Sequence, residues 1–304
     1  MTPYRYRIHG LTLTSAMELP ELAPAPAGDE SDVLVEQGDV ESRLAKVRDE
    51  GPCWMAGEGQ FLLDIAEVAR YRVSGGNHVR IQAAPGATPG DIRVFLLGSA
   101  LGVLLHQRGL LALHAGAVEV DGQAVAFAGH SGAGKSTLVA HLRQRGHRLI
   151  SDDLLTVSLD AQGQPWTQPS FARIKLWADA LRHIPHREDM LARCHSRLDK
   201  FLLSAPDDYR DQPIPLKRLY ILAENHEDDT VSLQPMTGLD AVKTLARETY
   251  KPRQIKAMGL EMDHFKLCSR TAGRIEMAVL RRPKKLTQMA RVLDFLEATW
   301  KSHD

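Results

Sequence analysis

Hydrophobic and polar positions alternate in short runs over about the first 85 residues, which predicts β-strands. Clusters of Gly, Pro, Asp and Asn separate the runs, as turns do. The stretch 20–32 is rich in Pro and Ala and is predicted to be a surface loop. The pattern therefore predicts a β-rich N-terminal module, residues 1–87. Its expected strands are residues 4–8, 33–35, 61–65, 71–73 and 79–81.

The pattern changes at Thr88, where a helix is predicted to begin. Thr88-Pro89-Gly90-Asp91 combines a capping residue, a proline at the first helical position and an acid three residues after the cap. The helix that follows, about 90–107, is apolar almost all round and is expected to be buried. It is also expected to form the hinge between the N-terminal module and the rest of the chain. Its longest apolar run, 94–105, has 12 residues, too few to span a bilayer.

A compact unit of strands and one helix is predicted next. Asp121-Gly122 is a strong hairpin signal between two strand-like segments. A glycine-rich loop leads from the second strand into a helix, and Gly146 is expected to end that helix. The predicted elements are strands at 117–120, 123–128 and 148–151 and a helix at 136–145.

The C-terminal third of the chain is predicted to contain several helices. A strand is expected at 217–222, a helix after the capping box Thr237-x-x-Asp240, and a last helix over about 286–300. The expected fold class is therefore α/β, more exactly α+β. Residues 88–304 are predicted to form a second domain with helical C-terminal segments.

Composition and charge exclude several classes of protein. The 304 residues contain 38 basic and 38 acidic side chains, so neither a nucleic-acid partner nor a membrane partner is expected. The three cysteines, Cys53, Cys194 and Cys268, are far apart and form no C-x-x-C pair, as in a reducing compartment. The N-terminal segment lacks the apolar core of a signal peptide, so a cytoplasmic location is expected.

The segment with the clearest chemistry follows the strand at 123–128. It matches G-x-x-x-x-G-K-[ST], the phosphate-binding P-loop, in which glycines let successive N–H groups point into one concavity. Lys135 is expected to reach the β- and γ-phosphates and Ser136 to bind Mg²⁺, so ATP and Mg²⁺ are the expected cofactors. The predicted nucleotide-binding residues are Gly129, His130, Ser131, Gly132, Ala133, Gly134, Lys135, Ser136 and Thr137.

Two carboxylates are predicted to lie beside this loop. Asp152 and Asp153 follow the strand that comes after the P-loop helix, 17 residues beyond Lys135. One carboxylate can hold Mg²⁺, and the other can accept the proton of an attacking hydroxyl. His114 precedes Lys135 by 21 residues, but a lone histidine in an apolar run is more often a core residue.

Other candidate side chains carry weaker signals. His183, His186, Cys194 and His195 form a loose set without standard zinc spacing, so no metal site is expected there. The basic segment 281–285 is expected to be a solvated face, although it could also guide an acidic peptide or a phosphate. The same two interpretations apply to the bases at positions 247, 251 and 253.

Together these segments resemble the kinase domain of the HPr kinase/phosphorylase family. The resemblance covers about residues 110–157 and rests on Leu113-His114-Ala115-Gly116, the P-loop, the RGHRL segment and the Asp-Asp pair, in that order. It implies a P-loop kinase core related to phosphoenolpyruvate carboxykinase, ATP-dependent phosphorylation of a protein serine, and oligomers.

The resemblance also implies roles for individual residues. Asp152 matches the family's general base, and Asp153 and His114 match its companions in the site. With Asp152 as the base, Asp153 is expected to join Ser136 as a metal ligand. Arg218 stands in a segment similar to the family's substrate-capturing loop.

Two departures from the family pattern narrow this expectation. Thr137 replaces an acid, and Arg173-Ile174-Lys175-Leu176 has a base where the family has a metal-binding glutamate. Reverse phosphorylase activity and HPr as substrate are therefore not expected. The chain looks closer to divergent HPr kinase-like proteins of ribosomal peptide biosynthesis, including lasso peptides, some of which phosphorylate a serine of a precursor peptide.

Three hypotheses about function follow. The first is an ATP-dependent serine kinase in which Asp152, Lys135, His114 and Arg218 take part in catalysis. The second is a nucleotide-dependent binding module that holds a peptide or protein partner without transferring phosphate. The third is a small-molecule kinase on the same scaffold.

Overall fold

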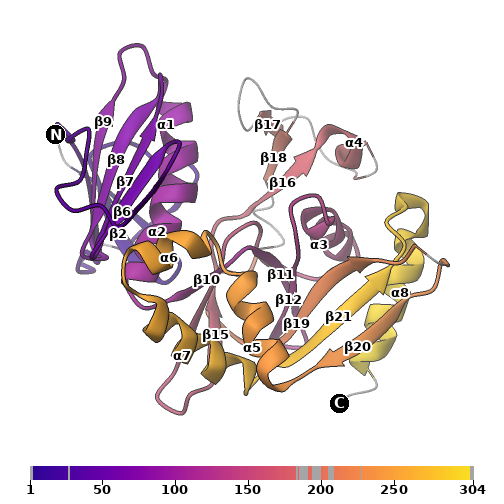
Figure 1. The fold of residues 1–304 in the computed structure, drawn as a ribbon. Helices are drawn as coiled ribbons and strands as arrows, with labels where there is room; N and C mark the ends of the chain where they lie inside the picture. The colour runs from indigo at the N-terminus through magenta and orange to yellow at the C-terminus, as the bar shows by residue number, and fades with distance from the viewer. Residues whose placement is uncertain are drawn as a thin grey trace.

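The computed structural model describes residues 3–26, 28–182, 184, 191–193, 200–204, 209–226 and 228–301. Among these residues the strands form two large sheets and a small three-stranded one. Figure 1 shows the first sheet in indigo and purple, with a helical segment between it and the second sheet. Helices and strands are mixed in the second part of the chain, so the predicted α+β class is confirmed.

The first sheet contains the strands of residues 4–83, and the expectation of a β-rich N-terminal segment is confirmed. Its strand order is β3-β1-β2-β4-β9-β8-β7-β6-β5. Four of these strands, β2, β3, β5 and β6, were not expected, and β3 lies within the predicted loop 20–32. The strands are β1 (Tyr4–Ile8), β2 (Leu11–Ser15), β3 (Ala23–Pro24), β4 (Val33–Gln37), β5 (Asp49–Gly51), β6 (Trp54–Gly57), β7 (Gln60–Ile65), β8 (Ala69–Ser74) and β9 (His78–Ala83).

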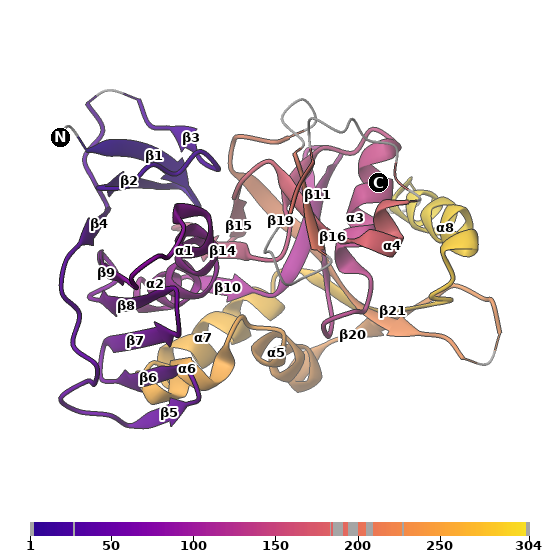
Figure 2. The same ribbon diagram turned by 90° about the horizontal axis from the view of Figure 1, so that it is seen from above.

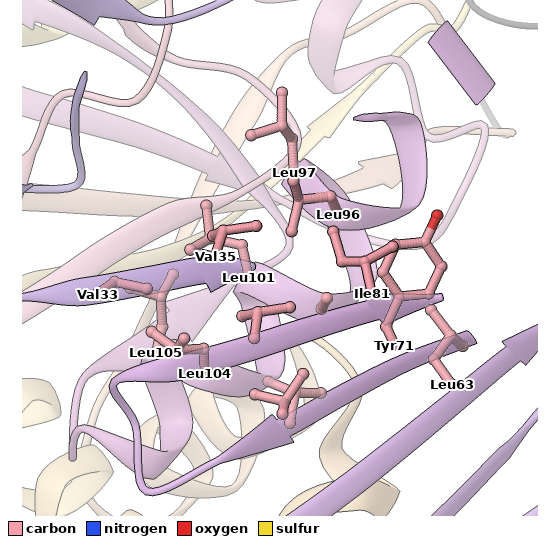
Figure 3. Packing of buried hydrophobic residues seen from close by; sticks show 14 of the residues in the cluster. Val33, Val35, Leu63, Tyr71, Ile81, Leu96, Leu97, Leu101, Leu104 and Leu105 are labelled. Carbon is pink, nitrogen blue, oxygen red and sulfur yellow. The ribbon is translucent and has the colours of Figure 1, made fainter. Parts of the chain in front are cut away.

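The predicted apolar helix covers this sheet. It runs through α1 (Pro89–Phe95), a π-helical turn η1 (Leu96–Ala100) and α2 (Leu101–Gln107). Thr88 caps it as expected, because its hydroxyl oxygen accepts a hydrogen bond from the Asp91 N–H at 3.2 Å. Figure 3 shows leucines of the helix packed beside apolar side chains of β4, β7, β8 and β9. The predicted domain boundary at 87/88 lies between the last strand and this helix.

The helix is longer than the 12-residue apolar run from which the sequence predicted a segment too short to span a bilayer. Pro89–Gln107 has 19 residues and a mean hydropathy of 1.2, which by length and composition alone is enough to cross a membrane. Within its most apolar stretch, 56% is buried inside the protein, and Ile92, Leu101 and Leu104 belong to the core. Core helices of globular proteins share these properties.

The second sheet places the P-loop. Its centre consists of three parallel strands, β12 (Gln123–Ala128), β19 (Ile214–Glu224) and β21 (Glu276–Arg282). The predicted hairpin is confirmed, because β11 (Ala115–Val120) pairs antiparallel with β12 across Asp121-Gly122. The remaining strands are β10 (Leu111–Leu113), β13 (Leu149–Ser151), β14 (Leu155–Leu159), β15 (Pro165–Gln168) and β20 (Ser232–Met236).

Helices cover both faces of this sheet (Figure 2). On one face α3 (Lys135–Gln144) and α8 (Met289–Lys301) pack against Tyr220 and Leu222. On the other face α5 (Gly238–Arg247) and α7 (Glu261–Ala272) pack against Leu219 and Ile221. This alternation follows from the two-residue period of a strand.

The ends of two predicted helices are informative. Gly146 follows α3 with a φ of 94°, the left-handed conformation of a glycine that ends a helix, so this prediction is confirmed. Thr237 stands at the start of α5, but its side chain makes no capping hydrogen bond, so the predicted capping box is wrong. The positive φ of 60° at Gly238 turns the chain away from the geometry of that motif.

The small sheet and the seam between the large sheets complete the fold. β16 (Arg173–Trp177), β18 (Lys200–Ser204) and β17 (Leu191–Arg193) form the small sheet, which α4 (Ala178–Leu181) follows. At the seam, His9 Nδ1 lies 2.8 Å from Thr156 Oγ1. The helix α6 (Pro252–Ala257) contacts the first sheet, where Arg253 forms two 2.6 Å bonds to Asp49.

Candidate active site

The P-loop is built as the sequence predicts, between a buried strand and a helix. β12 ends at Ala128 and α3 begins at Lys135. Three glycines between them have positive φ angles: 143° at Gly129, 83° at Gly132 and 90° at Gly134. Side chains are strained in this conformation, so the fold needs glycine at these positions. A Cβ atom on Gly134 would also lie 2.6 Å from Arg282 Nη2.

Lys135 folds back across this loop. Its side chain is buried, and its Nζ donates hydrogen bonds to the carbonyl oxygens of Gly129, at 2.7 Å, and His130, at 3.2 Å. These bonds hold the ammonium group at the mouth of the loop. A phosphate bound there would meet this positive charge together with the N-terminal end of α3.

A cavity of about 620 Å³ opens from the loop. One wall is formed by loop residues, and the opposite wall comes from the first sheet and its helix, including Glu21, Arg93 and Phe95. The cavity therefore lies where the two parts of the chain meet. The predicted site residues that it brings together are His114, Ser131, Gly132, Gly134, Lys135, Ser136, Thr137 and Asp153.

Asp153 faces this cavity and is held by two basic groups. His114 Nδ1 lies 3.3 Å from its Oδ1, and Lys175 Nζ lies 2.6 Å from its Oδ2. Burial opposes ionisation of Asp153, but the His114 hydrogen bond and the charge of Lys175 outweigh it and hold the pKa well below its usual range. Asp153 also has a φ of 74°, a strained conformation that sets the direction of its side chain.

Asp152 lies behind Asp153 and does not line the cavity. Only 2% of it is exposed, and its Oδ2 accepts the backbone N–H of Lys175 at 2.8 Å. Its Oδ1 is buried without a hydrogen-bond partner among the residues that the structure describes. Burial, with the charge of Asp153, raises the pKa of Asp152 to about 6, although Lys175 and a hydrogen bond with Ser136 oppose this.

His114 joins the site, although spacing alone did not place it there. It stands between β10 and β11, and its backbone N–H donates to the Glu248 carbonyl at 2.8 Å. Its ring lies 6.3 Å from the ring of Tyr250. It also lines a second hollow of about 460 Å³, whose other lining residues are Gly129, His130, Arg247, Glu248, Thr249, Tyr250 and Lys251.

Arg218 is not brought to the cavity. It is paired in register with Val125, three residues before β12 ends at Ala128 and the P-loop begins. Its buried guanidinium bonds Glu276 at 3.0 Å on the neighbouring strand. The structure therefore gives Arg218 a partner within the sheet and places it on the strand rather than at the loop.

Sequence reasoning missed Arg282, which was part of the expected solvated face 281–285. It is buried, and its Nη2 donates to the Ala133 carbonyl of the P-loop at 2.6 Å. Arg281, Lys284 and Lys285 are exposed, as expected. The signal that could have found Arg282 is its place at the carboxyl end of a strand, because parallel strands end at the same edge of a sheet.

The other candidate residues lie elsewhere. His183, His186, Cys194 and His195 are outside the described residues, and within the described part of the chain no cluster of three or more His, Cys, Asp or Glu could hold a metal ion. Arg247 pairs with Glu248 at 3.1 Å, and the Arg253 ion pair belongs to the seam.

Comparisons with known proteins match one part of the chain. No protein-family model matches it. A stretch of 48 residues is 48% identical to HPr kinase/phosphorylase of Treponema pallidum, and 58 residues are 38% identical to that of Streptococcus thermophilus. These stretches span 15% and 19% of the relatives' length, and 16% and 19% of this chain. The resemblance expected from the sequence is confirmed over this stretch.

A solved structure also aligns with the chain. The HPr(Ser) kinase/phosphatase from Coxiella burnetii aligns over 63% of this chain and 89% of its own, with a TM-score of 0.35 and 13% identity.

Proposed function

We propose that this HPr kinase-like chain transfers the γ-phosphoryl group of ATP to a serine hydroxyl. One observation carries the proposal: Lys135, Ser136 and Asp153 line the same cavity, next to the loop that the sequence marks as phosphate-binding. Phosphoryl transfer needs alignment and charge neutralisation more than covalent chemistry from the protein, and this cavity offers both.

The phosphates of ATP would lie along the glycine-rich loop. The N-terminal end of α3 favours negative charge there, and Lys135 exchanges its two carbonyl partners for phosphate oxygens. Arg282 supports the loop from behind through the Ala133 carbonyl. Arg282 is also one of the residues that line the cavity, so its positive charge lies near the bound phosphates.

The residues present fit one Mg²⁺ ion bound together with the nucleotide. Ser136 lies beside Asp152, whose buried Oδ1 lacks a hydrogen-bond partner among the described residues. Ser136 and Asp152 would hold the ion, with Asp152 acting directly or through water. When bound, Mg²⁺ neutralises charge on the phosphates.

Asp153 is the carboxylate placed to meet the acceptor. It lines the cavity, whereas Asp152 lies behind it, so we propose to exchange the roles first expected for the pair. The serine oxygen attacks the γ-phosphorus and the bond to the β-phosphate oxygen breaks. Because the pKa of Asp153 is held low, this carboxylate orients the hydroxyl at first and takes its proton only as the new bond to phosphorus forms. His114 and Lys175 fix the direction of this carboxylate.

The acceptor is proposed to be a peptide or protein, with a ribosomal precursor peptide of the lasso type as the first candidate. The resemblance to HPr kinase/phosphorylase favours a protein acceptor, since the matched relatives carry HPr in their names. The first sheet and its helix would form the acceptor side of the cavity, through Phe95 and Arg93. We propose that the reaction uses ATP and takes place in the cytoplasm.

The test measures phosphate on the acceptor by mass and, in parallel, slow ATP hydrolysis with water as acceptor, which needs no cognate peptide. Lys135→Ala is expected to abolish both. Asp153→Asn is expected to bind Mg²⁺·ADP like the parent but to transfer no phosphate. For Asp152→Asn, we expect that Mg²⁺ no longer strengthens nucleotide binding. Arg218→Met is the control: it removes an arginine that does not line the cavity and is expected to retain both activities.

Two results would contradict the proposal. If Lys135→Ala transfers phosphate as well as the parent, the loop is not the site. If nucleotide strengthens peptide binding while neither hydrolysis nor transfer occurs, the chain is a nucleotide-dependent binding module.

A further inference from the structure

One of the positively charged side chains that line the cavity is Lys175. Lys175, in β16, contacts both carboxylates of the Asp-Asp pair. Its backbone N–H donates to Asp152 Oδ2 at 2.8 Å, and its Nζ donates to Asp153 Oδ2 at 2.6 Å. The side chain is 30% exposed and lines the cavity together with Lys135. Its ammonium group is thus held at the wall that the phosphates would face.

The acids that line the cavity already have partners. Among the described residues they are Glu21, Asp153 and Asp179. Glu21 Oε1 is paired with Arg93 at 2.9 Å and with Arg173 at 3.6 Å, so two guanidinium groups balance its charge, although its buried Oε2 has no hydrogen-bond partner among the described residues. Asp179 accepts the Ala180 N–H at 2.9 Å. Asp153 is engaged on one oxygen by Lys175 and on the other by His114.

The pairing of these carboxylates with basic groups limits how many divalent metal ions the cavity can bind together with a nucleotide. Many phosphoryl-transfer sites hold two divalent cations, which clamp the attacking and leaving oxygens. A second ion needs anionic oxygen ligands of its own, because Mg²⁺ gives up its water reluctantly. Here the carboxylate that would serve is already neutralised by an ammonium group 2.6 Å away.

We propose that the Lys175 ammonium group takes the place of a second divalent cation, so that the nucleotide binds with a single metal ion. Lys175 would then supply positive charge from the protein to the phosphates, in the same cavity that Ser136 lines. The inference rests on the proposed function, because it assumes that the cavity binds a nucleotide. It adds a charge-supplying residue that neither the P-loop motif nor the Asp-Asp pair contains.

The experiment counts Mn²⁺ ions bound with a non-hydrolysable ATP analogue, by electron paramagnetic resonance during a Mn²⁺ titration. The parent is expected to bind one ion per nucleotide. Lys175→Glu, which places a third carboxylate beside the pair, is expected to bind two. Lys175→Met is expected to weaken nucleotide affinity roughly ten- to hundredfold, as expected for the loss of one charge-assisted hydrogen bond.

Two variants separate this role from a structural one. Lys175→Arg keeps the charge and is expected to keep one Mn²⁺ and near-parental affinity. Lys284→Met removes another lysine that lines the same cavity and is exposed, and is expected to change affinity less than Lys175→Met. Thermal unfolding without nucleotide shows which variants are folded.

Each outcome separates the two proposals. Two Mn²⁺ ions on the parent, or one on a folded Lys175→Glu variant, would overturn the role of Lys175 and leave the kinase proposal standing. A parent that binds no nucleotide under any metal condition would overturn the proposed function itself.

Discussion

His9 is expected to make the stability of this protein depend on pH. It lies at the seam between the two large sheets, where its Nδ1 contacts Thr156 Oγ1 at 2.8 Å and its backbone N–H donates to the Pro169 carbonyl at 3.1 Å. Only 1% of it is exposed, and burial lowers its pKa from 6.5 to about 3. The folded protein therefore keeps this imidazole neutral where the unfolded chain protonates it.

The sign and size of the effect follow from proton linkage. Between the two pKa values the unfolded state binds the extra proton, so stability is greatest above 6.5 and falls as the pH drops towards 3. At about pH 5 the free energy of unfolding is expected to be lower by about 2 kcal/mol because of His9 alone. Losing that much would weaken the seam that joins both walls of the cavity.

The assay compares urea unfolding of the parent and His9→Asn at about pH 7 and about pH 5. Asparagine is chosen because it tolerates the positive φ of 53° at this position. The variant is expected to be less stable at neutral pH, where it loses the contact with Thr156, but to lose about 2 kcal/mol less on acidification. Parallel losses in the two proteins would refute the reasoning.

The remaining predictions concern the loop, the strand and the seam. Arg282→Met is expected to weaken nucleotide binding roughly tenfold by calorimetry, whereas Arg281→Met, on the exposed side of the same strand, leaves it unchanged. Arg218→Met is expected to lower the melting temperature but retain the nucleotide affinity of the parent, since its partner lies within the sheet. Gly102→Ala would place a methyl group 2.6 Å from a tyrosine ring carbon and is expected to cost about 1–3 kcal/mol in urea unfolding, and Gly98→Ala much less.

The sequence alone predicted those parts of the site whose conformation is local. The P-loop follows a strand and opens a helix, and its glycines have the positive φ angles that the motif requires. The hairpin at Asp121-Gly122 and the cap at Thr88 were predictable for the same reason: neighbouring residues determine their backbone. The strand that follows the loop helix also places Asp153 correctly on the cavity wall.

Side chains whose partners are distant in sequence were not predictable. Arg282 and the P-loop are 149 positions apart, and they meet because β21 lies parallel to β19 and β19 to β12. Lys175 reaches the Asp-Asp pair from a separate small sheet. Arg218 does not line the cavity because it is paired with Val125, three residues before β12 ends and the loop begins.

By itself the sequence thus determined the glycine-rich loop with its lysine, a carboxylate pair nearby and a β-rich segment before them, since each depends on spacing along a few residues. The tertiary structure alone decided which carboxylate faces the cavity and which cations neutralise that carboxylate. It also decided which residues form the opposite wall of the cavity. The physical reason is that charge and burial depend on distances across the fold. Those distances follow from strand order and packing, not from the local pattern of residues.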